Sequence, residues 1–145
     1  MIPIDELLTY SNTKVTNRYT QDYPNNTLSP ESALAELLKF FWLSEKHKNE
    51  QFNVPDNPAL NFVCSIHPEM KEIDDLWHTF LLFTQDYMDF CDQYFKHYIH
   101  HVPLDKEKNL AAMDEESYIT ELQNYLSYIY DNLGEDTVVK WFHCN

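Results

Sequence analysis

Histidine and cysteine residues are concentrated in one stretch of this chain. Five of the seven histidines and two of the three cysteines lie between Cys64 and His101. Imidazole nitrogens and thiolates are the ligands that zinc and related divalent metals prefer in proteins. This stretch is therefore where we expect a site for a metal ion or a small polar ligand.

Asp74 and His78 are the most informative pair, because a helix places residues four apart on the same face. The carboxylate can then accept a hydrogen bond from one ring nitrogen and leave a lone pair on the other. A metal-binding or general-base histidine needs that arrangement. His100 and His101 point to opposite sides in an extended chain, so at most one of them is expected to face a site with His78. The simpler interpretation is that Asp74 is a first-turn acid that interacts with the helix dipole, and that His78 is a hydrogen-bonded structural residue.

The cysteines offer two further interpretations. Cys64 and His67 have a spacing that can hold zinc, but a structural zinc site takes four ligands. His143 and Cys144 would have to fold back to complete it. Cys91 falls on an apolar helix face, which favours a buried, inert thiol.

Apolar periodicity predicts the elements that must position these residues. Three main helices are expected over about residues 30–48, 73–98 and 114–133, with short helices at 4–10 and 136–142. The central helix would be about 39 Å long at ~1.5 Å per residue if it were unbroken. The predicted fold is all-α, an irregular helical bundle of three main helices plus short terminal helices.

The amino-terminal part of the chain has a different pattern from the rest. Residues 11–28 show no helical period, so residues 1–28 are interpreted as an arm or short helix plus an extension. Residues 29–145 are expected to form a single helical domain. Residues 49–71 contain three prolines and are expected to be largely non-helical.

Composition excludes several classes of function. The formal net charge is −14, which disfavours nucleic acid and anionic membranes and favours a protein partner with a basic surface. The chain holds one glycine, so phosphate-binding and dinucleotide-binding loops are excluded. No apolar run is long enough to span a membrane, and no secretory signal is apparent. Together with the odd number of cysteines, these features predict a cytoplasmic protein.

Aromatic, histidine and cysteine positions recur in a distinctive pattern over residues 67–103. The positions of this pattern are Asp74, Trp77, His78, Leu82, Thr84, Tyr87, Cys91, Phe95, His100, His101 and Pro103. In this pattern the chain resembles the glycine-rich domain-containing-protein-like family, which implies a helical domain and no particular activity. Many relatives have a second histidine where this chain has Phe80, and a glycine where it has Lys96.

The favoured function is a binding module with a polar His/Cys pocket for a metal ion or small ligand. A divalent ion such as zinc would be held by His78, His100 and His101. An acidic domain that binds or inhibits a basic partner is the alternative. A hydrolase with His78 as its base is the least favoured, because no nucleophile or oxyanion group is visible, so the balance is against an enzyme. The expected binding residues are Asp74, Trp77, His78, Tyr87, Cys91, His100 and His101.

Overall fold

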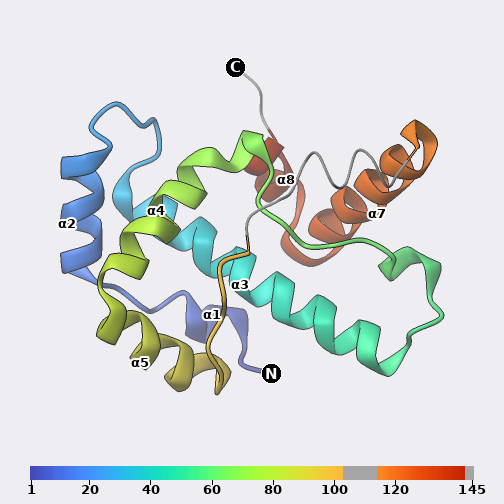
Figure 1. Ribbon diagram of the computed structural model, residues 1–145, viewed down its shortest axis with the longest axis horizontal. Coiled ribbons are helices and arrows are strands. Elements are labelled where there is room, and N and C mark those ends of the chain that lie inside the picture. The colour runs from blue at the N-terminus through green and yellow to red at the C-terminus, as the bar shows by residue number, and fades with distance from the viewer. Residues whose placement is uncertain (103–113, 143–145) are drawn as a thin grey trace. The chain divides into compact units, whose positions relative to one another are not determined.

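The computed structural model describes residues 1–102 and 114–142, and within these residues it contains helices and no strands (Figure 1). The all-α prediction is confirmed. None of the described helices is both long and apolar enough to cross a membrane. The helices are α1 (Ile4–Leu7), α2 (Thr13–Asp22), α3 (Pro30–Asn53), α4 (Lys71–Leu82), α5 (Thr84–Phe95), α7 (Glu115–Leu133) and α8 (Glu135–Phe142), with short 3-10 turns at Pro58–Leu60 and Pro68–Met70.

The chain divides into two compact units, and each is built from two separate stretches. The first unit comprises Met1–Trp42 and Met70–His101, and the second comprises Leu43–Glu69 and Val102–Asn145. The first part of α3 therefore belongs to the first unit and the rest to the second. The division into an arm and one helical domain at residue 28 stays a prediction.

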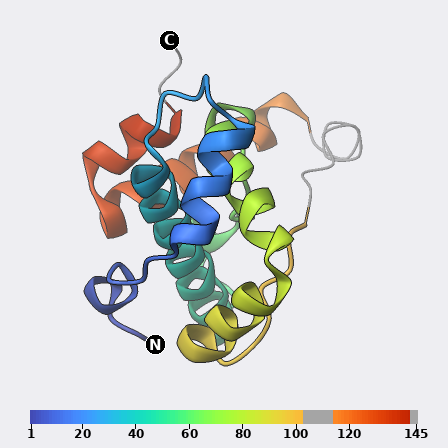
Figure 2. The ribbon, with the colours of Figure 1, turned by 90° about the vertical axis from the view of Figure 1, so that its left-hand side faces the viewer.

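In the first unit, α2 packs against α4, and α4 packs against α5 (Figure 2). The prediction that residues 11–28 lack a helix is wrong, because α2 occupies much of that segment. Two contributions stabilise it. The side chain of Asn12 caps the helix by accepting a hydrogen bond from the Val15 amide, and Val15 and Tyr19 are buried.

The single long helix predicted over residues 73–98 is also wrong, because the chain breaks at Phe83 between α4 and α5. The apolar spacing continues across the break, but the buried face changes. Met88 lies on the predicted core face and is exposed, whereas Tyr87 is buried. The Phe80 and Tyr87 rings meet across the break with centroids 5.0 Å apart. Aromatic side chains of α4 and α5 thus pack together across this bend, although the sequence has no proline or glycine there.

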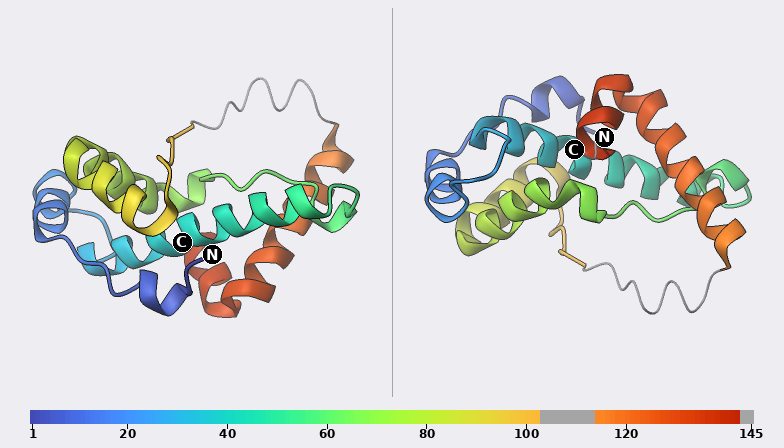
Figure 3. Two further views of the ribbon diagram at one scale, coloured as in Figure 1. Left: turned by 90° about the horizontal axis from the view of Figure 1, so that it is seen from below. Right: turned by 90° about the horizontal axis from the view of Figure 1, so that it is seen from above.

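In the second unit, α7 and α8 pack against each other and are joined at Gly134 (Figure 3). Asp114 caps α7 by accepting a hydrogen bond from the Ser117 amide at 2.7 Å, as its position before the helix predicts. Gly134 has a φ of 92°, a backbone conformation that favours glycine.

The predicted end of α3 near residue 48 is wrong, because the helix continues to Asn53. His47 is buried within this helix. Its ring is stacked on Phe62 at 4.0 Å, and its Nε2 lies 2.9 Å from the carbonyl oxygen of Leu60. These contacts lie beside the last turns of α3.

Candidate functional site

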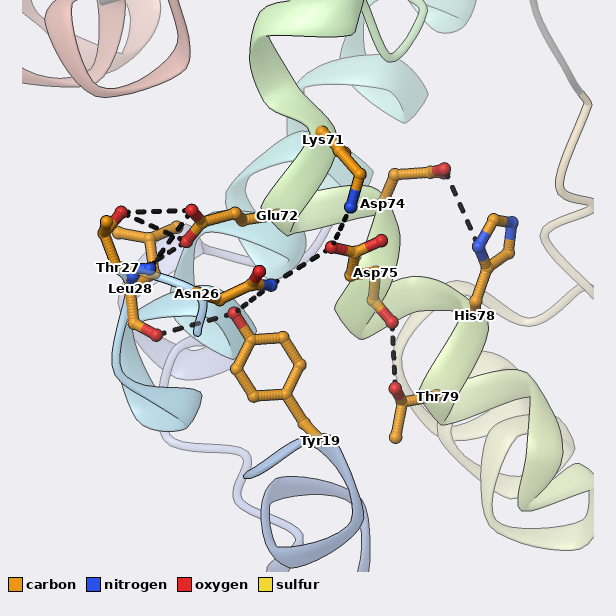
Figure 4. Close-up of polar contacts among 10 residues, drawn as sticks. All are labelled: Tyr19, Asn26, Thr27, Leu28, Lys71, Glu72, Asp74, Asp75, His78 and Thr79. Carbon is orange, nitrogen blue, oxygen red and sulfur yellow. Dashed lines mark hydrogen bonds and ion pairs between the residues drawn. The ribbon is translucent and has the colours of Figure 1, made fainter. Parts of the chain in front are cut away.

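Asp74 and His78 lie one turn apart on the same face of α4. The Asp74 Oδ2 and His78 Nδ1 atoms are 3.7 Å apart, and the two side chains point toward each other in Figure 4. The His78 side chain is 51% exposed and that of Asp74 is 25% exposed. The helix spacing thus places the imidazole beside the carboxylate on one face, as predicted from the sequence.

Polar contacts with the connection between α2 and α3 hold the start of α4 in place (Figure 4). The Glu72 carboxylate accepts hydrogen bonds from the backbone amides of Thr27 and Leu28 at 3.1 and 2.7 Å. Asn26 donates a hydrogen bond to Asp75, which is buried and also paired with Lys71. These contacts fix the turn of α4 that carries Asp74.

His101 reaches the same place from the other end of the α4–α5 pair. Helix α5 ends at Phe95, and the next residue, Lys96, caps it in a left-handed conformation with a φ of 64°. The chain then continues without helical structure to His101, whose Nε2 lies 2.6 Å from Asp74 Oδ1. The His78 and His101 rings are 4.7 Å apart. Ligand atoms of Asp74, His78 and His101 all lie within 4.8 Å of one another.

Trp77 lies against one side of this group. Its indole is buried, and the His101 ring lies 4.3 Å from it. Phe41 contacts the same indole edge-on at 5.0 Å. The His101 ring is therefore packed against the aromatic core, and its side chain is only 15% exposed.

Tyr87 fixes the backbone that carries His101. Its buried hydroxyl accepts a hydrogen bond from Trp77 Nε1 at 3.1 Å and donates one to the carbonyl of Ile99 at 2.5 Å. Burial raises the pKa of Tyr87, so the hydroxyl keeps its proton and can donate. Both Trp77 and Tyr87 were predicted as lining residues. Trp77 packs against the ring of His101, and Tyr87 binds the backbone two residues before it.

The other predicted binding residues do not join this group. His100 is exposed, and its ring contacts Tyr98 at 4.8 Å. Cys91 is buried in α5 next to Tyr87, as its place on the apolar face suggested. The metal ligands suggested from the sequence were His78, His100 and His101, whereas the described cluster pairs His78 and His101 with Asp74.

Cys64 and His67, the possible zinc ligands suggested by their spacing, lie in different surroundings from the Asp74 group. Cys64 is half-buried, and burial raises the pKa of its thiol to about 12, which disfavours the thiolate that binds zinc. His67 packs against the rings of Tyr125 and Phe142. His143 and Cys144, like Pro103, lie outside the described residues. Two open hollows of about 510 and 340 Å³ in the second unit adjoin Pro58, and neither is lined by a predicted binding residue.

The Asp74, His78 and His101 group has the donor atoms of a divalent metal site. In a tetrahedral zinc site with bonds of about 2.0–2.1 Å, neighbouring ligand atoms are about 3.3 Å apart. The 2.6 Å contact between Asp74 and His101 is a hydrogen-bond distance, so an ion would move these two groups slightly apart. His78 would move closer, and its exposed side chain leaves room for that rotation.

Comparisons with known proteins identify the family of this chain but no individual similar protein. The UCP032817-like family matches residues 7–120, which is more than half of the chain. The resemblance to the glycine-rich domain-containing-protein-like family is therefore wrong, because the family that matches is a different one. No curated protein and no solved structure matches the chain.

Proposed function

We propose that this chain, which belongs to the UCP032817-like family, is a metal-binding protein that holds one divalent ion between Asp74, His78 and His101. The observation that carries the proposal is the convergence of three ligand groups within 4.8 Å. Two of them come from α4 and the third comes from a segment more than twenty residues further along the chain. Zinc is the ion we favour, since it takes histidine nitrogen and aspartate oxygen together.

The surroundings of the three ligands support this proposal. A ligating histidine is usually held by contacts outside the coordination sphere, and these contacts tune its affinity for metal. Here Trp77 packs against the His101 ring, and Tyr87 binds the backbone carbonyl of Ile99. The formal charge of −14 adds a long-range attraction for cations.

The test is metal analysis of protein purified without a histidine tag, followed by calorimetric titration of the metal-free protein with Zn²⁺. We expect one ion per chain in the wild type and in His100→Ala, and loss of that binding in His101→Ala. His100→Ala is a matched control, because it removes the neighbouring, exposed imidazole. At a zinc concentration 100 times the Kd, binding would stabilise the fold by about 2.7 kcal/mol. For a chain of this length that corresponds to a rise in Tm of about 5–11 °C.

Two results would contradict the proposal. One is a wild-type protein that neither retains nor binds a divalent ion. The other is an equal loss of binding in His100→Ala and His101→Ala, which would indicate unspecific coordination by exposed histidines. A circular dichroism spectrum of each variant checks that the fold is retained.

A second candidate is an acidic domain that binds a protein with a basic surface, and the −14 charge favours it. We expect such a complex to weaken steeply as salt is added, because exposed charges are screened. Binding of a lysine-rich peptide that does not depend on salt would contradict this candidate. We place either function in the cytoplasm, because Cys64 and Cys91 carry thiols and reducing compartments preserve thiols.

A further inference from the structure

We propose that the metal ion at Asp74, His78 and His101 keeps one coordination position open to solvent, where a small anion displaces a bound water molecule. This inference rests on the proposed function and adds to it the class of ligand that the site would take. It follows from the number of ligands, their exposure and their charge.

The number of ligands is the first argument. Within residues 1–102 and 114–142, three ligand-bearing side chains converge, and no fourth one joins them. Zinc sites that serve only structure have four protein ligands, whereas sites with three protein ligands keep a position for water or substrate. His100 directly precedes His101 in the same segment, but its side chain is exposed and its ring packs against Tyr98.

The exposure of the three side chains gives the direction of the open position. The exposed fraction rises from 15% at His101 to 25% at Asp74 and 51% at His78. Trp77 is buried and covers the side of the site at His101. The ion would therefore be closed off at the indole and open to solvent beside His78.

The charge of the ligands indicates which molecules would bind there. A divalent ion held by one carboxylate and two neutral imidazoles keeps a net charge of about +1. An anion that replaces the water neutralises this charge. Carboxylates, phosphate and small inorganic anions such as azide share this chemistry, and azide is the simplest probe.

Cobalt(II) substitution tests the inference, because Co²⁺ takes the place of zinc and its visible absorption bands depend on the ligand set. We expect the metal-free protein to develop these bands with one equivalent of Co²⁺, and azide to shift them in a saturable manner. His100→Ala should behave as the wild type does. The double variant His78→Ala/His101→Ala should show neither the bands nor a response to azide.

The two proposals fail in different ways in this experiment. If Co²⁺ produces no protein-dependent bands, the metal site itself is disproved. If the bands form but azide leaves them unchanged, the ion has a fourth ligand from the chain, and only the open position is disproved. If azide does shift the bands, a titration with inorganic phosphate separates a general anion site from one that accepts only azide.

Discussion

Replacing Tyr87 with phenylalanine tests how the structure holds His101 in place. The substitution keeps the ring and removes a buried hydroxyl that links Trp77 Nε1 to the carbonyl of Ile99. Both of these groups then lose a partner in a place that water does not reach. An unsatisfied buried donor or acceptor costs about 1–3 kcal/mol. We therefore expect the free energy of unfolding to fall by about 2–6 kcal/mol. That is a large part of the roughly 5–15 kcal/mol of a typical domain.

The assay is urea denaturation followed by far-ultraviolet circular dichroism, with Tyr98→Phe as the control. Tyr98 belongs to the same segment, but its side chain is exposed to solvent. Its variant should change stability by no more than about 0.5 kcal/mol. Zinc affinity should also fall in Tyr87→Phe, because the segment carrying His101 loses its tether. Equal stabilities of the two variants would refute the assigned role of the Tyr87 hydroxyl.

Two further predictions concern the rest of the fold. Glu72→Gln should lower the free energy of unfolding by about 1 kcal/mol, because the charged acceptor for the Thr27 and Leu28 amides is lost. The control Glu69→Gln, at an exposed position, should leave the free energy of unfolding unchanged. Equal effects of the two substitutions would contradict this role of Glu72. Burial lowers the pKa of His47 below its ordinary value of 6.5, so the unfolded chain takes up the proton first as the pH falls. Stability should therefore decrease below about pH 6.5 and decrease less in His47→Gln, and parallel pH profiles of the two proteins would disprove this.

The starts of α3 and α7 were predictable from the sequence because capping is local. Ser29 accepts a hydrogen bond from the Ser32 amide, and Asp114 accepts one from Ser117, each a few residues away. Helix α2 was missed because its stability comes from packing against α4, a distant part of the chain. The break at Phe83 was missed because the local sequence contains neither proline nor glycine, and the bend accompanies tertiary aromatic contacts.

The meeting of His78 with a later histidine was predicted, but it is incompatible with the straight helix predicted alongside it. At ~1.5 Å per residue, an unbroken helix would carry Tyr98 about 36 Å from Asp74. The three residues from there to His101 span about 10 Å at most. The break at Phe83 therefore makes the site possible. Alternation along an extended chain predicted that at most one of the paired histidines would face His78, but not which one.

The division of the chain between the two units affects how the protein emerges during synthesis. All of the first unit, up to His101, leaves the ribosome before α7 and α8 do. Residues 43–69 are then already present, but the helices that cover them in the second unit are not. Leu60 and Phe62, which are buried in the finished protein, would be exposed on this nascent chain. These apolar side chains would be accessible to a chaperone at this stage, and their exposure should end once α7 has left the ribosome.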